Sequence, residues 1–307
     1  MPSASRRFFR PCVVLLGALL ATGSGGWIPA ADPVRVVVWD GRQPAQRQAY
    51  ENFLGNRIAA HLRGLEGLDV RSVSLDDGEQ GLAPAIRDFA QVLVWWGHVR
   101  QAEVGADTGR DIVARVKAGR LTLVALHSAH WSTPFVEAMN ERARDDVRAV
   151  FADVPADKLS IEEVPAPARK VPAREARLTP AHDVRKFPDG RVHVRLHLPN
   201  CCFPAFRSDG KPSHLRVATP GHPLAAGLPD AFSLPRTEMY DEPFHVPEPD
   251  DVVLEERWEP GEWFRSVMVW RLGAGRVIYI RPGHETFPIF EDPRMLRLVE
   301  NAVRWRE

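Results

Sequence analysis

Three histidines each follow a short apolar run of the chain. His98 comes after residues 92–97, His127 after residues 121–126, and His284 after residues 277–283. Short β-branched runs are typical of buried strands in a parallel sheet, and ligands of open α/β sheets bind outside the carboxyl ends of the strands. We therefore expect the three imidazoles to share one site, where they can serve as general acids and bases or as metal ligands.

The surroundings of two of these histidines suggest specific roles. Gly97 permits a sharp turn that delivers His98 into a crevice, although a histidine there can also simply cap a strand end. His127 lies where a strand is expected to turn into a helix, the position of the nucleophile elbow of several hydrolases, with Ser128 beside it. The flanking glycines of G-x-S-x-G are missing, which disfavours a serine nucleophile. His130 is close enough to His127 to bind the same ligand, but this spacing is common by chance.

A cluster of acidic residues surrounds one of the three tyrosines of the chain. Glu238, Asp241 and Glu242 flank Tyr240 within five residues. Such a cluster can supply an acid, a base and a group that binds sugar hydroxyls, and a solvated acidic loop is the alternative.

The segment 281–286 combines Arg281, a proline, a glycine, His284 and Glu285. It would provide a cation for an oxyanion or carbonyl, an imidazole for proton transfer and a nearby carboxylate. Arg265 is expected to point to the same crevice. For each arginine, a structural salt bridge is the alternative.

The same imidazoles also suit a metal. His98, His127 and His284 could hold zinc or another divalent ion that polarises a sugar carbonyl or a water molecule. Proton transfer without a metal is the competing interpretation, and the residue types do not separate the two.

Alternating strands and helices are expected to position these groups. From residue 34 to residue 127 the apolar pattern alternates at βαβ spacing, which predicts a mostly parallel sheet covered by helices. One long helix is expected over 45–62, a hairpin at residues 273–275 and a closing helix over 295–305. The segment from about 142 to 209 is rich in proline and charge and is expected to be an irregular insertion, in which residues 192–198 could add a strand with His193 and His197 on one face.

The composition indicates the kind of partner, and the N-terminal segment indicates the cellular compartment. The 307 residues carry 40 basic and 40 acidic side chains, so no charge excess favours nucleic acid, and a small molecule is the expected partner. Arg6 and Arg7 precede the apolar segment 13–21 and small residues up to Ala31. This pattern predicts a signal peptide over 1–31, with a twin-arginine signal favoured over an ordinary secretory one and an uncleaved anchor as the alternative. Cleavage near Ala31 would leave a periplasmic or extracellular protein with no stable membrane anchor.

Two further questions stay open in the sequence. Cys201 and Cys202 are adjacent, which disfavours a disulfide between them and leaves structural thiols or a metal as their uses. A homo-oligomer is compatible with the sequence.

The motifs together resemble the ThuA-like, trehalose-utilisation family, in the order of that family and over most of the chain. The segments that carry the resemblance are 38–39, 93–98, 126–130, 221–225, 238–244, 264–266 and 281–286. The resemblance implies a ThuA-like domain over 32–307 with a flavodoxin-like three-layer α/β sandwich similar to class I glutamine amidotransferases. It also implies activity on disaccharides or their 3-keto derivatives. No cysteine stands at the elbow, where His127 lies, so glutamine amidotransferase chemistry is excluded.

The expected function is that of an exported carbohydrate-active enzyme that uses His/Glu acid–base chemistry for elimination or hydrolysis. The expected catalytic residues are His98, His127, Tyr240, Glu242, Arg265, His284 and Glu285, and the expected substrate-binding residues are Trp96, Ser128, His130, Glu238 and Arg281. A metal-dependent sugar hydrolase or isomerase and a non-catalytic sugar-binding module are the alternatives.

Overall fold

The structure, a computed structural model, describes residues 32–166, 170–200 and 204–305. The expected signal peptide and the pair Cys201 and Cys202 lie outside these residues. Residues from Pro33 onward form one compact unit. Within the described ranges, no helix combines the length and the apolar character needed to cross a membrane.

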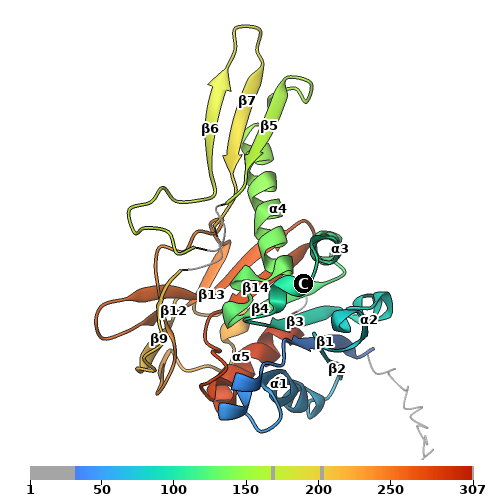
Figure 1. Cartoon of the computed structure of the whole chain (residues 1–307), viewed down its shortest axis with the longest axis vertical. Coiled ribbons are helices and arrows are strands. Elements are labelled where there is room, and N and C mark those ends of the chain that lie inside the picture. Colours follow the sequence, from blue (N-terminus) through green and yellow to red (C-terminus); the bar gives the residue numbers. More distant parts are fainter. Residues whose placement is uncertain (1–31, 167–169, 201–203, 306–307) are drawn as a thin grey trace, which may run out of the picture. The chain divides into compact units, whose positions relative to one another are not determined.

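A nine-stranded sheet forms the centre of this unit (Figure 1). Five neighbouring strands run parallel, in the order β14, β4, β3, β1 and β2; their bounds are β1 (Val34–Asp40), β2 (Leu68–Ser74), β3 (Val92–Trp96), β4 (Thr122–Leu126) and β14 (Gly275–Ile280). Four antiparallel strands extend the sheet beyond β14, in the order β13 (Trp263–Leu272), β12 (Asp251–Arg257), β9 (Ser213–Val217) and β10 (Ala231–Leu234). The expected mixed α/β fold with a large parallel sheet is confirmed, and the expected hairpin joins β13 to β14.

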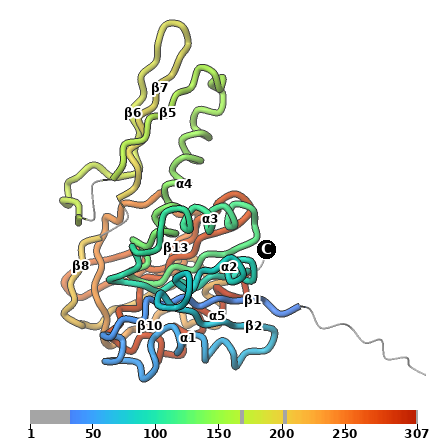
Figure 2. Tube along the Cα trace, turned by 45° about the vertical axis from the view of Figure 1, so that its right-hand side comes forward, coloured from blue at the N-terminus to red at the C-terminus, as the bar shows by residue number. Residues whose placement is uncertain are grey.

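Helices cover both faces of the parallel strands (Figure 2). One face packs against α1 (Leu54–Arg63) and α5 (Pro293–Arg304), and the other against α2 (Pro84–Phe89), α3 (Ala106–Lys117) and α4 (Thr133–Val150). The alternation of side chains along β1 explains this, because Val36 and Val38 enter the first core and Val37 and Trp39 the second. Trp39 stacks on Trp95 of β3 with ring centroids 3.8 Å apart.

The long helix expected over residues 45–62 is in fact divided. A 3-10 turn (Pro44–Gln48) comes first, and Phe53 has a φ of 59° immediately before α1 begins. The break is stabilised by buried polar contacts: Gln46 accepts a hydrogen bond from the backbone of Leu54, and Asp40 accepts one from Gly55. Apolar periodicity alone did not reveal this interruption.

The segment expected to be irregular contains regular structure. Helix α4 continues to Val150, and a three-stranded sheet follows, in the order β5 (Leu159–Val164), β7 (Val192–His197) and β6 (Ala181–Lys186). The buried side chains of β7 pack with Ala143 and Val147 of α4, which gives this small sheet a core of its own. Strand β7 confirms the expected added strand, and its outward histidines pair with carboxylates, His193 with Glu162 and His197 with Asp183.

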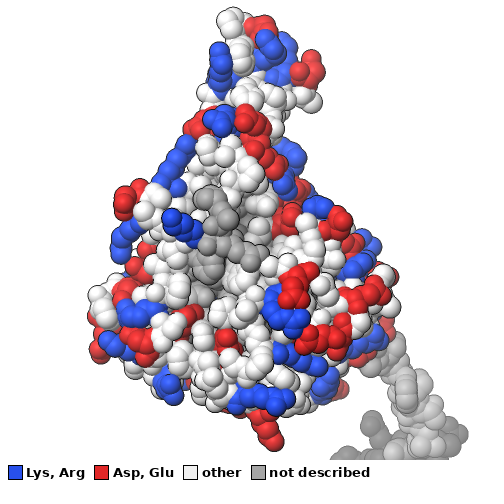
Figure 3. Space-filling model, viewed as in Figure 1, with Lys and Arg blue, Asp and Glu red and all other residues white. Residues whose placement is uncertain are grey.

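Charges of both signs alternate over the surface seen in Figure 3, without a large patch of either sign on that face. Some of the ion pairs are local, such as Arg142 with Asp146, and others join distant segments, such as Arg142 with Asp250. The distribution follows the zero net charge of the sequence.

One ion pair is completely buried between Glu256 on β12 and Arg281, which directly follows β14, with β13 between these two strands. Arg281 donates to Glu256 at 2.5 Å, both side chains have zero exposure, and Ser266 donates to the second carboxylate oxygen at 2.7 Å. A buried charge without its partner is costly because the protein interior solvates it poorly. The two residues therefore depend on each other.

We expect Glu256→Gln to lower the free energy of unfolding by about 3 kcal/mol, because it leaves the Arg281 guanidinium buried without a counter-charge. Glu255→Gln is the control, since this neighbouring side chain pairs at 3.0 Å with the exposed Arg216, and loss of a surface pair costs less than about 1 kcal/mol. Urea unfolding of both variants measures the difference. Equal effects would contradict the dependence of Arg281 on Glu256.

Candidate functional site

The register of the sheet brings the three histidines together. Strands β3, β4 and β14 are neighbours, so residues that follow them emerge at one edge. The ring centroids of His98 and His284 are 5.8 Å apart, and those of His127 and His284 are 5.4 Å apart. These separations are small enough for one reactant or ion to contact more than one imidazole.

His127 occupies a special turn at the end of β4. Its φ is 50°, a conformation that few residues with a side chain adopt, and the residue is fully buried. Nδ1 lies 2.8 Å from the carbonyl oxygen of Arg281, and Nε2 lies 3.1 Å from Oε2 of Glu238 without the alignment of a regular hydrogen bond. The carbonyl contact fixes the proton on Nδ1, so Nε2 is the atom that faces the site.

His98 and Glu285 form a carboxylate–imidazole pair. Nδ1 of His98 lies 2.9 Å from Oε1 and 3.1 Å from Oε2 of Glu285, which leaves Nε2 for a reactant. Burial lowers the pKa of His98, but the hydrogen bond and charge of Glu285 outweigh it and raise the pKa above its ordinary value. Burial likewise raises the pKa of Glu285, whereas His98 lowers it, with a net decrease. This arrangement orients an imidazole for proton transfer.

His284 lies between the other two imidazoles. Burial and the neighbouring His127 lower its pKa from the ordinary value. Its Nδ1 accepts a hydrogen bond from the backbone N–H of Thr286 at 3.3 Å and lies 3.0 Å from Oγ1 of the same residue, while its Nε2 lies 3.9 Å from Oε1 of Glu238. Nε2 therefore points to the same carboxylate as His127.

Glu238 is the ionised centre of the site. Burial raises the pKa of its carboxyl group, but His127 and His284 outweigh this effect and lower the pKa to about 2. Ser208 donates a hydrogen bond to its Oε1. Tyr240, two residues further, stacks on His127 with centroids 5.2 Å apart, and burial raises its pKa well above the ordinary value, so that its hydroxyl stays a donor.

A small hollow opens beside these groups. The residues that line it are His98, Ser128, His130, Trp131, Pro204, Phe206, Glu238 and Tyr240. Phe206 is 52% exposed and lies directly opposite Tyr240, because β8 (Ala205–Arg207) pairs with β11 (Met239–Asp241). The hollow thus combines polar groups on its inner wall with aromatic side chains at its rim.

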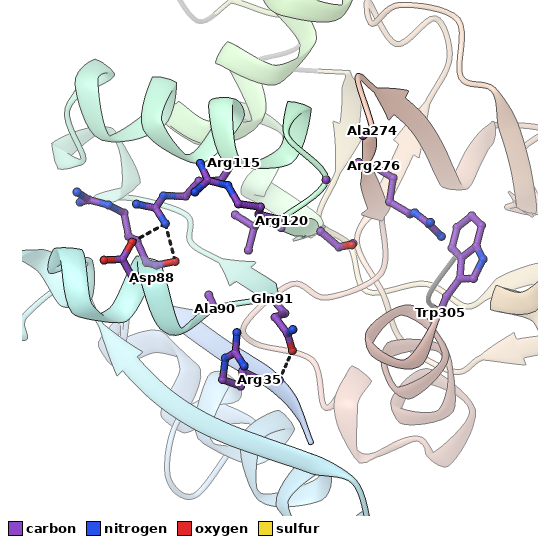
Figure 4. Close-up of a pocket in the computed structure, with 14 residues that line it drawn as sticks. Arg35, Asp88, Ala90, Gln91, Arg115, Arg120, Ala274, Arg276 and Trp305 are labelled. Carbon is purple, nitrogen blue, oxygen red and sulfur yellow. Dashed lines mark hydrogen bonds and ion pairs between the residues drawn. The ribbon is translucent and has the colours of Figure 1, made fainter. Parts of the chain in front are cut away.

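A larger hollow lies at the opposite edge of the sheet and is lined by a different set of residues (Figure 4). It is lined by residues at the amino ends of the parallel strands. Its arginines bind carbonyl groups around α2 and α3: Arg35 donates to Phe89, Arg87 to Leu82 and Arg115 to Arg87. These contacts stabilise the ends of helices, and none of the three clustered imidazoles reaches this edge.

A comparison with known protein families identifies the family of this chain. A family model described as trehalose utilisation (ThuA) matches residues 35–306. The chain belongs to the ThuA family.

Solved structures of two ThuA-like proteins resemble this family member. A putative ThuA-like protein from Parabacteroides merdae has a TM-score of 0.53 and 16% identity, with 89% of this chain and 91% of that chain covered. A putative ThuA-like protein from Bacteroides uniformis has a TM-score of 0.52 and 14% identity, with 90% and 92% covered. At these identities the likeness concerns the fold alone. Comparison with curated proteins gives no match.

Some of the residues expected in the site of this ThuA protein lie beside it with structural partners. Glu242 and Arg265 bind each other at 2.8 Å, and Glu242 also accepts from the backbone of Phe244. Trp96 is fully buried and donates to the carbonyl of Gly283 at 2.9 Å, which fixes the loop that carries His284.

Arg281 likewise acts through other residues. Its guanidinium donates to the carbonyl of Glu238 and to Oγ1 of Thr237, while its own carbonyl accepts from His127. It holds the strand ends together rather than pointing into the hollow. His130 and Ser128 line the hollow, where the edge of the His130 ring meets Tyr240 with centroids 5.7 Å apart.

Two groups of side chains in the ThuA site have the composition of a metal site. His127, Glu238 and His284 form one, and His98, His284 and Glu285 form the other, each with its candidate ligand atoms within 4.8 Å of one another. The ligands expected from the sequence are His98, His127 and His284, with Glu238 expected to bind substrate. Thr286, Ser208 and Phe206 are not among the expected residues, because their positions depend on pairings between segments far apart in the chain.

We expect Gly283→Ala to destabilise the protein because a Cβ there would lie 3.1 Å from Cβ of His127 and 3.3 Å from the ring of Phe290, at a φ of 151°. Gly67→Ala is the control, because its φ of 76° is also unfavourable but nothing lies within 4 Å. The control should cost about 1–2 kcal/mol. Gly283→Ala should add about 1–3 kcal/mol from overpacking. Denaturant unfolding compares them, and a smaller effect at Gly283 would show that His127 is not tightly confined.

Proposed function

We propose that this ThuA family member is a carbohydrate-active enzyme that eliminates the anomeric group of a 3-keto glycoside by acid–base catalysis. The observation that carries the proposal is the His98–Glu285 pair, which faces the same hollow as the neutral hydroxyl of Tyr240. A ketone at C3 acidifies the hydrogen at C2, so an oriented imidazole is a sufficient base.

The reaction needs one proton acceptor that later becomes a donor. Nε2 of His98 removes the C2 proton, and the electrons of that bond form the enolate of the C3 ketone. As the carbonyl forms again, a C1–C2 double bond is made and the bond from C1 to the glycosidic oxygen breaks. The His98 imidazolium then protonates the leaving oxygen, and Glu285 stabilises its charge meanwhile. The products are an unsaturated 3-keto sugar and a free alcohol, and addition of water to the former would make the net reaction a hydrolysis.

Tyr240 suits the developing enolate. Its hydroxyl remains protonated because burial raises its pKa well above the ordinary value, and it lines the hollow with His98. A donor fixed in a low-dielectric site stabilises an oxyanion more strongly than water does, since it needs no reorganisation. Phe206, which is exposed at the hollow, supplies an apolar face against which a sugar ring can stack.

We expect His98→Gln to lower kcat on a 3-keto disaccharide by about 10²–10⁴-fold, because a side-chain amide cannot accept the C2 proton. Glu285→Gln should lower kcat in the same direction. His197→Gln is the matched control, since this histidine also pairs with a carboxylate, Asp183 at 2.7 Å, on the small sheet. Substrate deuterated at C2 should show a primary isotope effect.

Unaltered turnover in His98→Gln would refute the assignment of the base. Sugar binding without turnover in the unmodified protein would instead favour a non-catalytic sugar-binding module. Turnover without exchange or isotope effect at C2 would indicate hydrolysis by another route.

We further propose that the protein is exported to the periplasm or beyond the cell. The support is the pattern of Arg6 and Arg7 before an apolar segment that is too short to span a bilayer, followed by small residues up to Ala31. The paired arginines match a signal that is read by a receptor of the twin-arginine pathway.

Replacement of Arg6 and Arg7 by lysine should retain the protein in the cytoplasm as the uncleaved chain, because lysine keeps the charge but not the arginine pair that the receptor reads. Replacement of Arg10 by lysine is the control and should leave export unchanged. Cell fractionation with mass determination of the amino terminus measures both. Cytoplasmic location of the unmodified protein would contradict the proposal.

A further inference from the structure

The contact between His127 and Glu238 requires a positive charge between the two side chains. Nδ1 of His127 carries a proton, because it lies 2.8 Å from a carbonyl oxygen that can only accept. In the neutral ring the lone pair of Nε2 then faces Oε2 of Glu238 at 3.1 Å. Two electron-rich atoms repel at this distance in a buried site, where water screens little. Either a second proton or a metal cation must lie there.

The positions of the atoms fit a metal ion. Nε2 of His284 lies 3.9 Å from the other oxygen of Glu238, and the ligand atoms of all three residues lie within 4.8 Å of one another. Ligands of a tetrahedral zinc ion are about 3.3 Å apart, given bonds of about 2.0–2.1 Å. The observed separations of 3.1 Å and 3.9 Å lie on either side of this value.

The surrounding contacts also resemble those of metal-binding residues. An imidazole that binds a metal usually donates its other N–H to a carbonyl or a carboxylate, which fixes the tautomer and the ring. His127 does this through Arg281, and Ser208 donates to Glu238. For His284, the backbone N–H of Thr286 donates to Nδ1 at 3.3 Å, so the neutral ring carries its proton on Nε2. A cation at Nε2 would move this proton to Nδ1, where Oγ1 of Thr286 at 3.0 Å can accept it.

We propose that His127, Glu238 and His284 bind one divalent transition-metal ion, with zinc as the expected ion. Two imidazoles and one carboxylate are typical of zinc and of other transition metals such as iron(II), whereas magnesium and calcium prefer oxygen ligands alone. Three protein ligands leave a position for the reactant, as in catalytic zinc sites. The role of the ion rests on the proposed function: it would polarise the C3 carbonyl oxygen while His98 removes the proton.

Metal content tests the binding without any substrate. The protein is incubated with zinc sulfate, dialysed extensively and measured by elemental analysis. We expect about one zinc per chain, and less than a tenth of that in His127→Asn and in Glu238→Gln. Asparagine is chosen because it tolerates the left-handed backbone of position 127. His193→Gln is the matched control, since this histidine pairs with Glu162 on the exposed face of the small sheet and should leave the zinc content unchanged.

Two further measurements keep the test decisive if a variant folds poorly. Cobalt(II) in place of zinc should give the visible absorption of a four-coordinate ion in the unmodified protein and lose it in His284→Gln. Dipicolinate should lower Tm of the zinc-loaded protein by several degrees, because an ion that binds only the folded state stabilises it. Zinc below a tenth of an equivalent in the unmodified protein, or equal content in all variants, would overturn the proposal and leave a proton between His127 and Glu238.

Different experimental outcomes would contradict the metal site and the proposed reaction. Full turnover of a 3-keto disaccharide by protein stripped of metal would remove the ion but retain the acid–base enzyme. One bound zinc together with no turnover would retain the metal site and remove the proposed reaction.

Discussion

The parallel pairing of β3, β4 and β14 is the constraint on which the site depends. Trp96 pairs with Leu126, and Ile280 pairs with Leu126 on the other side, so the three strands end at the same level of the sheet. Each strand is buried on both faces and has little freedom to slip, because a shift by one residue would turn every side chain to the opposite core. The register of the strands therefore already brings the imidazoles that follow them close together, and no contact between the histidine side chains themselves is needed.

The loops beyond the strands convert this common edge into a defined arrangement. Trp96 donates to the carbonyl of Gly283, His127 donates to that of Arg281, and the guanidinium of Arg281 donates to that of Glu238. Each of these contacts joins segments that are distant in sequence. Glu256 balances the buried charge of Arg281 and so supports the arrangement from the opposite side. The strength of the network lies in its fully buried donors and acceptors, for which water offers no substitute.

The sequence was sufficient for the strands and for the meeting of the histidines, because apolar runs and strand-end residues are local patterns. It was not sufficient to predict which residue each charged side chain contacts. Glu238 and Glu242 lie in one acidic cluster, yet Glu238 faces His127 whereas Glu242 binds Arg265. The two are only four positions apart, and the pairing of β11 with β8 and the position of β13 decide between them. The break before α1 was not predicted for a related reason. The buried side-chain amide of Gln46 accepts a hydrogen bond from the backbone of Leu54 and so stabilises the break, and the spacing of apolar residues does not reveal such a polar contact.

The pairing of β8 with β11 has a consequence for how such a protein can diversify. The inner wall of the hollow is formed by β11 and by residues that follow strands of the central sheet, whereas Phe206 at the rim comes from the end of a segment whose small sheet has a core of its own. Strand β8 joins the two parts by its pairing with β11, and contacts of Arg174 with Asp241 and of Thr179 with His245 connect them as well. The length and chemistry of the inserted segment can therefore change during evolution, and the ligands that enter at the rim can change with it. The reactive groups on the inner wall keep their positions.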